Sequence, residues 1–198
     1  KIWEYNPLNP QQLKDYDVSS YCYRHSRRDW KVSAYDKGYG INYDGDSRKP
    51  EYLIDGEKKT NWSSGKINDK PLELPYYIIF DLNKVSDIDG VYLANGYSNQ
   101  CLADVHVEYI GSEVADPYDI NAPWETLLQV TDPNVVRANL KNERFFDCPR
   151  TQARYLRLKI SNPNTIVFKS DSDLTEEEKA NQKKYHSFAE FGTYYKKP

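Results

Sequence analysis

The stretch YLRLKI at residues 155–160 gives the clearest indication of the fold. Its aliphatic residues alternate with Arg157 and Lys159, and this period of two is that of a β-strand with one buried face. Seven further short segments are alternating or β-branched, with turn-rich loops between them: 30–35, 77–82, 90–94, 105–110, 126–130, 144–147 and 188–194. Eight short strands predict an antiparallel β-sandwich or barrel rather than alternating strands and helices.

The composition is polar, yet its aromatic content argues against a disordered chain. Hydrophobic residues make up 38% of the 198 residues and charged residues 29%, with a mean hydropathy of -0.88. Aromatic residues nevertheless reach 14%, and there are 18 tyrosines, whereas disordered chains contain few such rings. We therefore expect one folded domain, which is also what the chain length suits.

The charges favour neither nucleic acid nor an anionic membrane as a partner. Lysine and arginine number 27 against 30 aspartates and glutamates, so the formal net charge is -3. Both of those partners attract a basic excess. No stretch approaches the roughly 18 apolar residues of a membrane span. We expect no binding to nucleic acid, and contact with a membrane only through an anchor outside this sequence.

A single helix is expected, inside a long insertion at residues 162–186. Thr175 and Glu178 stand as a capping box with lysines following, so the helix should run from Thr175 to about Lys184. It has almost no apolar face, which favours a solvated surface helix over a recognition helix. We assign residues 1–23 to an N-terminal arm or linker end and 24–198 to the domain.

The cysteines leave the redox state open. Cys22, Cys101 and Cys148 lie too far apart for a paired zinc or redox motif. At most one disulfide can form among them, and buried free thiols are an equally good interpretation.

Motifs of common enzyme classes are absent from the sequence. It has no nucleophile elbow, P-loop or zinc-protease motif. His25, His106 and His186 are the histidine candidates for a general base, but His106 lies mid-strand, where it should face outward. No acidic pair stands in the apolar setting of a catalytic dyad. We expect no catalysis by this chain.

The stretch YLIDGEKKTNW at residues 52–62 has the features of an oxygen-lined turn. Asp55 and Gly56 begin a tight turn in which the aspartate can point inward, and Thr60 can return a hydroxyl to the same point. A hard cation needs six to eight such oxygen ligands. Since Asp-Gly is also an ordinary hairpin turn, this segment alone leaves both interpretations open.

Seven short segments, taken in order, resemble one family. They read WKVSA from residue 30, then YLIDGEKKTNW, YIIFDL, IDGV, WETL, ARYLRL and SFAEF, and they span residues 30–194. The chain resembles the discoidin family, also called coagulation factor V/VIII type C domains, which includes carbohydrate-binding modules. The resemblance implies an all-β, eight-stranded antiparallel jelly-roll sandwich of the galactose-binding-like type with binding loops at one end. Trp30 and Trp62 would then be core residues.

Many bacterial members hold a structural calcium ion, and the resemblance implies its ligands here. They would be side-chain oxygens of Asp55, Thr60 and Glu190 and backbone carbonyls of Tyr52, Glu57 and Ala189. Six ligands with two negative charges suit calcium. The alternative is a metal-free turn at which Asp55 and Glu190 make hydrogen bonds.

The resemblance also points to ligand-binding residues. Sugar recognition needs an aromatic face for the pyranose ring and polar groups for its hydroxyls. The candidates are Asn95, Tyr97 and Asn99 in the loop after residue 94, and Tyr185, where similar modules often carry a stacking aromatic. For each, an ordinary solvated side chain is the alternative.

Ser63 and Lys66 depart from the pattern. They stand where some members carry a histidine and an aromatic residue, which puts galactose-type specificity in doubt.

The function implied is that of a non-catalytic carbohydrate-binding module that tethers a bacterial protein to glycan. The sequence begins with Lys1 and has no methionine or leader, so we expect a processed or trimmed chain. A secreted or cell-surface location is expected, including the periplasm or the outer membrane exterior, with a monomeric domain that can accompany a catalytic domain elsewhere in the parent protein. The alternatives are a protein or phospholipid adhesion domain of discoidin type, a purely structural domain and a small hydrolase.

Overall fold

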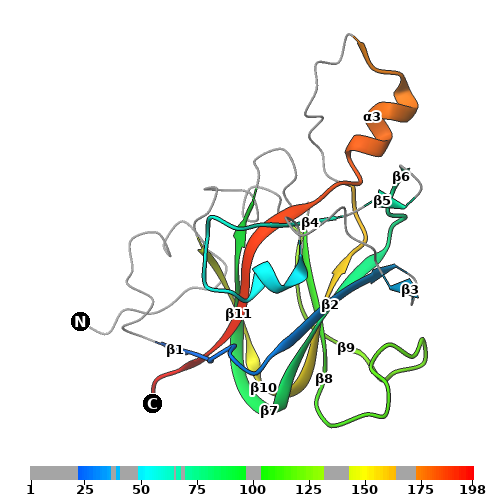
Figure 1. Cartoon of the computed structure of the whole chain (residues 1–198). Coiled ribbons are helices and arrows are strands. Elements are labelled where there is room, and N and C mark those ends of the chain that lie inside the picture. The colour runs from blue at the N-terminus through cyan, green and yellow to red at the C-terminus, as the bar shows by residue number, and fades with distance from the viewer. Residues whose placement is uncertain are drawn as a thin grey trace.

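Two long strands form the frame of the molecule. The computed structural model describes residues 22–36, 39–40, 49–64, 66–67, 70–96, 104–131, 143–163 and 173–198. Strands β7 (Tyr76–Asn95) and β10 (Glu143–Ile160) pair antiparallel, from Tyr76 opposite Ile160 to Ala94 opposite Glu143. Each strand contains two of the segments predicted from the sequence, because both strands continue from one layer of the sandwich into the other (Figure 1).

The first layer is built around residues 76–81 of β7 and 155–160 of β10. On one side, β2 (Lys31–Asp36) pairs with β7, and on the other, β8 (Val105–Ile110) pairs with β10 and with β9 (Glu125–Val130). Leu156, Leu158 and Ile160 are buried, whereas Arg157 and Lys159 are half-buried. This confirms the predicted one-sided strand.

The second layer contains the other halves of β7 and β10 together with β11 (Ser187–Lys196). β11 pairs with β7 and also with two short strands, β1 (Cys22–Arg24) and β4 (Trp62–Ser63). Register shifts between Asp147 and Thr151 and between Ala153 and Tyr155 mark where β10 passes between the layers. The predicted all-β antiparallel sandwich is confirmed.

The core lies between the two layers. Phe80 of the first layer stacks on Phe191 of the second, with ring centroids 4.1 Å apart. Trp62 is fully buried beside Phe188, and Trp30 is buried against Phe80, as expected for both tryptophans.

Shorter elements complete the described structure. They are β3 (Tyr39–Gly40), the 3-10 helix η3 (Pro50–Leu53), the pair β5 (Lys66–Ile67) and β6 (Lys70–Pro71), and α3 (Glu176–Gln182). The capping box at Thr175 and Glu178 is present as predicted. Figure 1 shows α3 projecting beyond the end of the sandwich near β5 and β6. None of the helices in the described ranges is long and apolar enough to span a bilayer.

Two sequence-based assignments fall at the edge of what is described. The boundary placed after residue 23 lies inside β1, where Cys22 and Tyr23 pair with Lys196 and Tyr195. Cys22 and Cys148 belong to β1 and β10, and Cys101 lies outside the described residues.

Candidate functional site

The turn that follows η3 brings several oxygen atoms together. Gly56 has a φ of +83°, a conformation that glycine adopts without steric cost. Asp55 Oδ1 accepts a hydrogen bond from the Glu57 N–H at 2.8 Å, which fixes the carboxylate over the turn. The predicted tight turn is therefore present, with the aspartate bonded to its own backbone.

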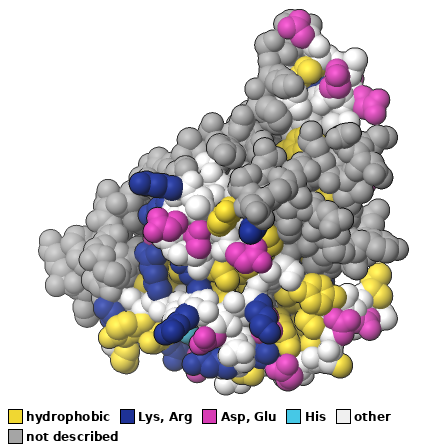
Figure 2. Space-filling model, viewed as in Figure 1, with side chains coloured by type: hydrophobic (Ala, Val, Ile, Leu, Met, Phe, Trp, Pro, Cys, Tyr) yellow, Lys and Arg dark blue, Asp and Glu magenta, His cyan; other side chains and the backbone are white. Residues whose placement is uncertain are grey.

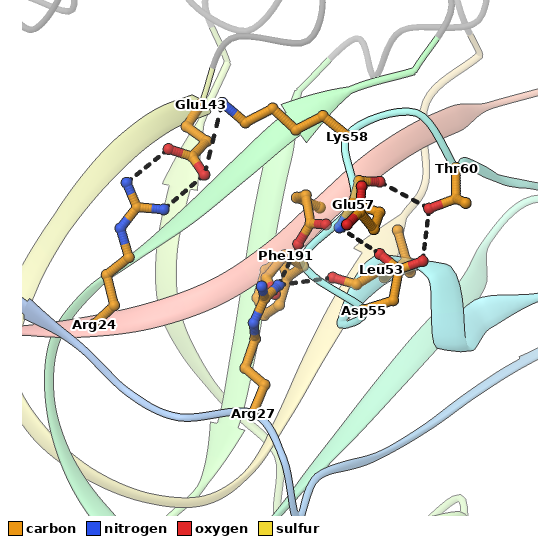
Figure 3. A network of polar contacts seen from close by, with 10 residues as sticks. Arg24, Arg27, Leu53, Asp55, Glu57, Lys58, Thr60, Glu143 and Phe191 are labelled. Carbon is orange, nitrogen blue, oxygen red and sulfur yellow. Dashed lines mark hydrogen bonds and ion pairs between the residues drawn. The ribbon is translucent and has the colours of Figure 1, made fainter.

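Thr60 closes this turn with a hydroxyl that has two acceptors. Its Oγ1 lies 2.6 Å from Asp55 Oδ2 and 2.7 Å from the Glu57 carbonyl oxygen (Figure 3). A hydroxyl has one proton and can donate to only one of them at a time. The Glu57 carbonyl also accepts a hydrogen bond from the Thr60 N–H at 3.1 Å, so the hydroxyl proton is available to Asp55. Oxygens from three predicted metal ligands thus lie around the Thr60 hydroxyl, joined by the hydrogen bonds expected of a metal-free turn.

Strand β11 supplies the other acidic group. Phe188 is opposite Asn95 and Glu190 is opposite Ala94, so Ala189 is the extra residue of a β-bulge. A bulge changes the direction of the groups around it and often occurs next to functional sites. It thereby sets the position of Glu190, whose side chain is only 2% exposed.

One oxygen of Glu190 is left unsatisfied. Its Oε1 is buried and has no hydrogen-bond partner, whereas Oε2 accepts from Arg27 Nη1. Burial raises the pKa of Glu190 to about 7 despite the Arg27 hydrogen bond, and the nearby Asp55 carboxylate adds to the rise. An unpaired carboxylate oxygen beside a second carboxylate is a position that favours a cation.

Arg27 also lies in this cluster and was not singled out from the sequence. Besides Glu190, Nη1 donates to the carbonyl oxygens of Leu53 at 3.1 Å and Phe191 at 2.8 Å (Figure 3). Arg27 and Glu190 are 163 positions apart, and two of its acceptors are backbone groups. No local pattern in the sequence could have identified these contacts.

A second ion-pair group lies beside the first. Arg24 donates two hydrogen bonds to the Glu143 carboxylate, at 2.6 and 2.7 Å, and Lys58 Nζ is 4.0 Å from the same carboxylate. The face in Figure 2 shows basic and acidic side chains lying close together rather than in areas of one sign. These contacts link β1, the Asp55 turn and the start of β10.

The predicted calcium ligands fit an oxygen-liganded cation in their chemistry. Asp55, Thr60 and the Glu57 carbonyl converge, and Glu190 reaches them from β11. Tyr52 belongs to η3 and Ala189 is the bulge residue, so both lie on the segments that carry these groups. Among the described residues, no cluster of three or more His, Cys, Asp or Glu side chains could hold a metal ion. A cation here would therefore depend on carbonyl and hydroxyl oxygens as well as on two carboxylates.

Two of the four predicted sugar-binding positions, Asn95 and Tyr185, lie at the same end of the sandwich. Asn95 ends β7 opposite Phe188, and the Gly96 N–H donates to the Ser187 carbonyl at 3.3 Å. Tyr185, which is half-buried, precedes Ser187 by two residues. The backbone at Asn95 and Tyr185 is thus brought to the same end.

The other residues singled out from the sequence are described only in part. Tyr97 and Asn99 lie outside the described residues, as do the side chains of Asn95 and Lys66. Ser63 is buried, 5% exposed, in β4.

A buried cluster of polar side chains, Tyr76, His186 and Ser64, lies next to Tyr185 and Ser187 in the chain or in contact with their segment. Tyr76 Oη lies 2.5 Å from His186 Nδ1, and the His186 N–H donates to Ser64 Oγ at 3.0 Å. Both rings are fully buried, and burial raises the pKa of Tyr76 well above its usual value. His186 therefore acts in packing and hydrogen bonding, and the sequence did not reveal this role.

His25 and Glu190 are both held by neighbouring groups of the fold. His25 contacts Thr193 Oγ1 at 2.9 Å, and burial lowers its pKa. Glu190 and Asp55 are the acidic pair closest in kind to a catalytic dyad, but Glu190 is enclosed by Arg27 and backbone carbonyls. A substrate could contact this carboxylate only by displacing Arg27 and these carbonyl groups.

Comparison with known proteins agrees with this architecture. The F5/8 type C domain family matches residues 31–170. No curated protein sequence matches the chain.

Several solved structures share the fold. The Clostridium perfringens domain CpGH89CBM32-5, in complex with GalNAc-β-1,3-galactose, has a TM-score of 0.58 at 17% identity, over 86% of this chain and 99% of that one. The C-terminal domain of a chitobiase from Bacteroides fragilis has a TM-score of 0.58 at 21% identity, over 89% of this chain and 100% of that one. CBM32-3 from a family 31 glycoside hydrolase of C. perfringens has a TM-score of 0.59 at 19% identity, over 90% of this chain and 97% of that one.

Proposed function

Because the chain belongs to the F5/8 type C domain family, we propose that it is a non-catalytic carbohydrate-binding module of a secreted or cell-surface bacterial protein. The module would hold its parent protein close to a glycan. Similar folds occur in a domain solved with GalNAc-β-1,3-galactose and in a module of a glycoside hydrolase. GalNAc-β-1,3-galactose is therefore the first ligand to test, within a wider set of glycans because Ser63 and Lys66 depart from the galactose-type pattern.

The observation that carries this proposal is the convergence of β7 and β11 at one end. Through the Gly96 to Ser187 hydrogen bond, the loop that bears Tyr97 and Asn99 begins beside the segment that bears Tyr185. An aromatic ring and amide groups carried at one end supply the two kinds of contact that a pyranose needs. A shallow site of this kind buries little area, so the affinity per site should be weak, roughly high micromolar to millimolar.

We further propose that calcium binds at the Asp55 turn. Asp55, Thr60 and Glu190 would bind it through side chains, and Tyr52, Glu57 and Ala189 through backbone carbonyls. The ion would supply positive charge to the Glu190 carboxylate and join the turn to β11. The unsatisfied Glu190 Oε1 supports this assignment.

A glycan array followed by calorimetry tests the sugar-binding proposal. Tyr185→Ala, Tyr97→Ala and Asn99→Ala should each weaken binding of a retained glycan about tenfold or more, since one stacking ring or bidentate amide is lost. Tyr23→Ala is the matched control, because Tyr23 is 49% exposed and pairs with the far end of β11. An array without a binder, or equal binding by all four variants, would overturn the proposal.

Co-sedimentation with liposomes separates the adhesion alternative. Ile120 is 95% exposed in the β8–β9 connection, but Asp116 and Asp119 lie beside it in sequence. Acidic neighbours oppose binding to anionic lipid. We expect no sedimentation with phosphatidylserine vesicles, and saturable binding would favour the lipid alternative.

A further inference from the structure

Arg27 contacts its acceptors in the manner of a bound cation. A single nitrogen, Nη1, lies within hydrogen-bond distance of three oxygens, from Glu190, Leu53 and Phe191. That nitrogen carries only two protons and can donate only two hydrogen bonds at a time. The third oxygen is therefore held by electrostatic attraction to the guanidinium charge. The Arg27 side chain is 14% exposed, so water screens this charge little.

The three acceptors belong to segments that are far apart in the chain. Leu53 ends η3 immediately before the Asp55 turn, and Phe191 follows Glu190 in β11. Arg27 itself lies between β1 and β2. The guanidinium therefore joins the same two segments, the turn and β11, that a calcium ion would join.

The charges around the cluster explain why two cations would fit. Asp55 and Glu190 carry two negative charges when ionised, and Arg27 neutralises one of them through Glu190 Oε2. Glu190 Oε1 is buried and remains unsatisfied. The Glu190 carboxylate thus has one oxygen bonded to Arg27 and one oxygen available to bind an ion.

We propose that Arg27 is a built-in cation of this site, which holds the Asp55 turn against β11 when calcium is absent and leaves Glu190 Oε1 to the metal. The inference rests on the calcium site proposed above. It predicts that the stability of the wild-type fold depends only weakly on calcium. Removal of the arginine charge should make this stability depend strongly on calcium.

Thermal unfolding of the whole chain, in excess EDTA and in excess calcium chloride, tests this. The calcium-induced rise in Tm should be at least about twice as large in Arg27→Gln as in the wild type, because calcium then supplies the only positive charge at Glu190. Arg24→Gln is the matched control: it removes the same charge from the adjoining strand β1 but frees Glu143 instead, and its calcium-induced rise in Tm should equal that of the wild type. A rise in Arg27→Gln no larger than in the control would overturn the proposal.

The proposal remains testable if Arg27→Gln fails to fold in one or both conditions. Arg27→Gln that unfolds in EDTA and folds in calcium supports the proposal directly. If it folds in neither, Arg27→Lys keeps the charge and should fold in EDTA with a calcium response no larger than that of the wild type. A lysine variant that is unfolded in EDTA would contradict a role based on charge.

A double-mutant cycle separates this inference from the calcium proposal. If calorimetry detects no calcium binding to any variant, the calcium proposal fails, and the arginine is then tested in EDTA alone. Glu190→Gln should raise the Tm more in the Arg27→Gln background than in the wild type, since an unpaired buried carboxylate costs more than a paired one. Equal gains in the two backgrounds would show that Arg27 does not neutralise Glu190.

Discussion

Replacement of Glu190 by glutamine should change stability in opposite directions with and without calcium. Burial raises the pKa of Glu190 from 4.5 to about 7, after the favourable contact with Arg27 is included. This difference corresponds to about 3 kcal/mol by which the folded state disfavours the ionised form at pH 8. Glutamine occupies the same volume, keeps an acceptor for Arg27 and removes the charge. In EDTA at pH 8 the variant should therefore be more stable, by up to about 3 kcal/mol.

The pH dependence follows from the same shift. A carboxyl with a raised folded pKa binds more protons in the folded than in the unfolded state between about 4.5 and 7. In EDTA, Glu190 should therefore make the wild-type free energy of unfolding fall, relative to that of the variant, as the pH rises through this window, and the difference should level off above it. His25, whose lowered pKa acts in the opposite direction, contributes alike to both chains and cancels in this difference. In calcium the order should reverse if Glu190 is a ligand as proposed, because its replacement would then weaken binding of the metal.

Urea unfolding at pH 5 and pH 8, each in EDTA and in calcium, measures these free energies. Glu51→Gln is a suitable control, since Glu51 is exposed in the nearby η3. A Glu190 variant less stable than the wild type in EDTA at pH 8 would refute the cost assigned to the buried carboxylate. A variant with unchanged calcium affinity would refute its role as a ligand.

Two glycines give further predictions. Gly56→Ala must place a side chain at a φ of +83°, which costs about 1–2 kcal/mol in urea unfolding and should also weaken calcium binding, because the Asp55 turn shifts; an unchanged affinity would contradict this. A Cβ at Gly90 would lie 2.5 Å from the Phe146 carbonyl oxygen and 2.3 Å from the buried Tyr194 ring. Gly90→Ala should therefore lower the free energy of unfolding by about 1–3 kcal/mol without affecting glycan binding, and a stable variant would refute the close packing there.

The sequence allowed the strands to be predicted where burial is one-sided and local. Residues 155–160 show the period of two because one face of β10 meets the core, and Thr175 shows its cap because the bonded groups are three residues apart. The burial of Trp62 was likewise expected from its place in the family pattern.

What the sequence could not show depends on contacts between distant residues. Residues 83–87 are mostly exposed and polar, so they resemble a loop, yet Ser86 and Asp87 pair with β10 and make β7 continuous. Strands β1 and β4 are two or three residues long and exist because β11 lies beside them. The Arg27 contacts are of the same kind.

Chemical-shift mapping of the isotope-labelled chain shows whether glycan binds at the end of the sandwich that carries Tyr185. The chain is titrated with GalNAc-β-1,3-galactose and with each glycan that the array retains. Glycan binding at this end should cause saturable shifts of the Tyr185, Gly96 and Ser187 amides, with Tyr23 and Tyr195 at the far end of β11 unchanged. Shifts confined to Tyr23 and Tyr195, or no saturable shift with any of these glycans, would contradict it.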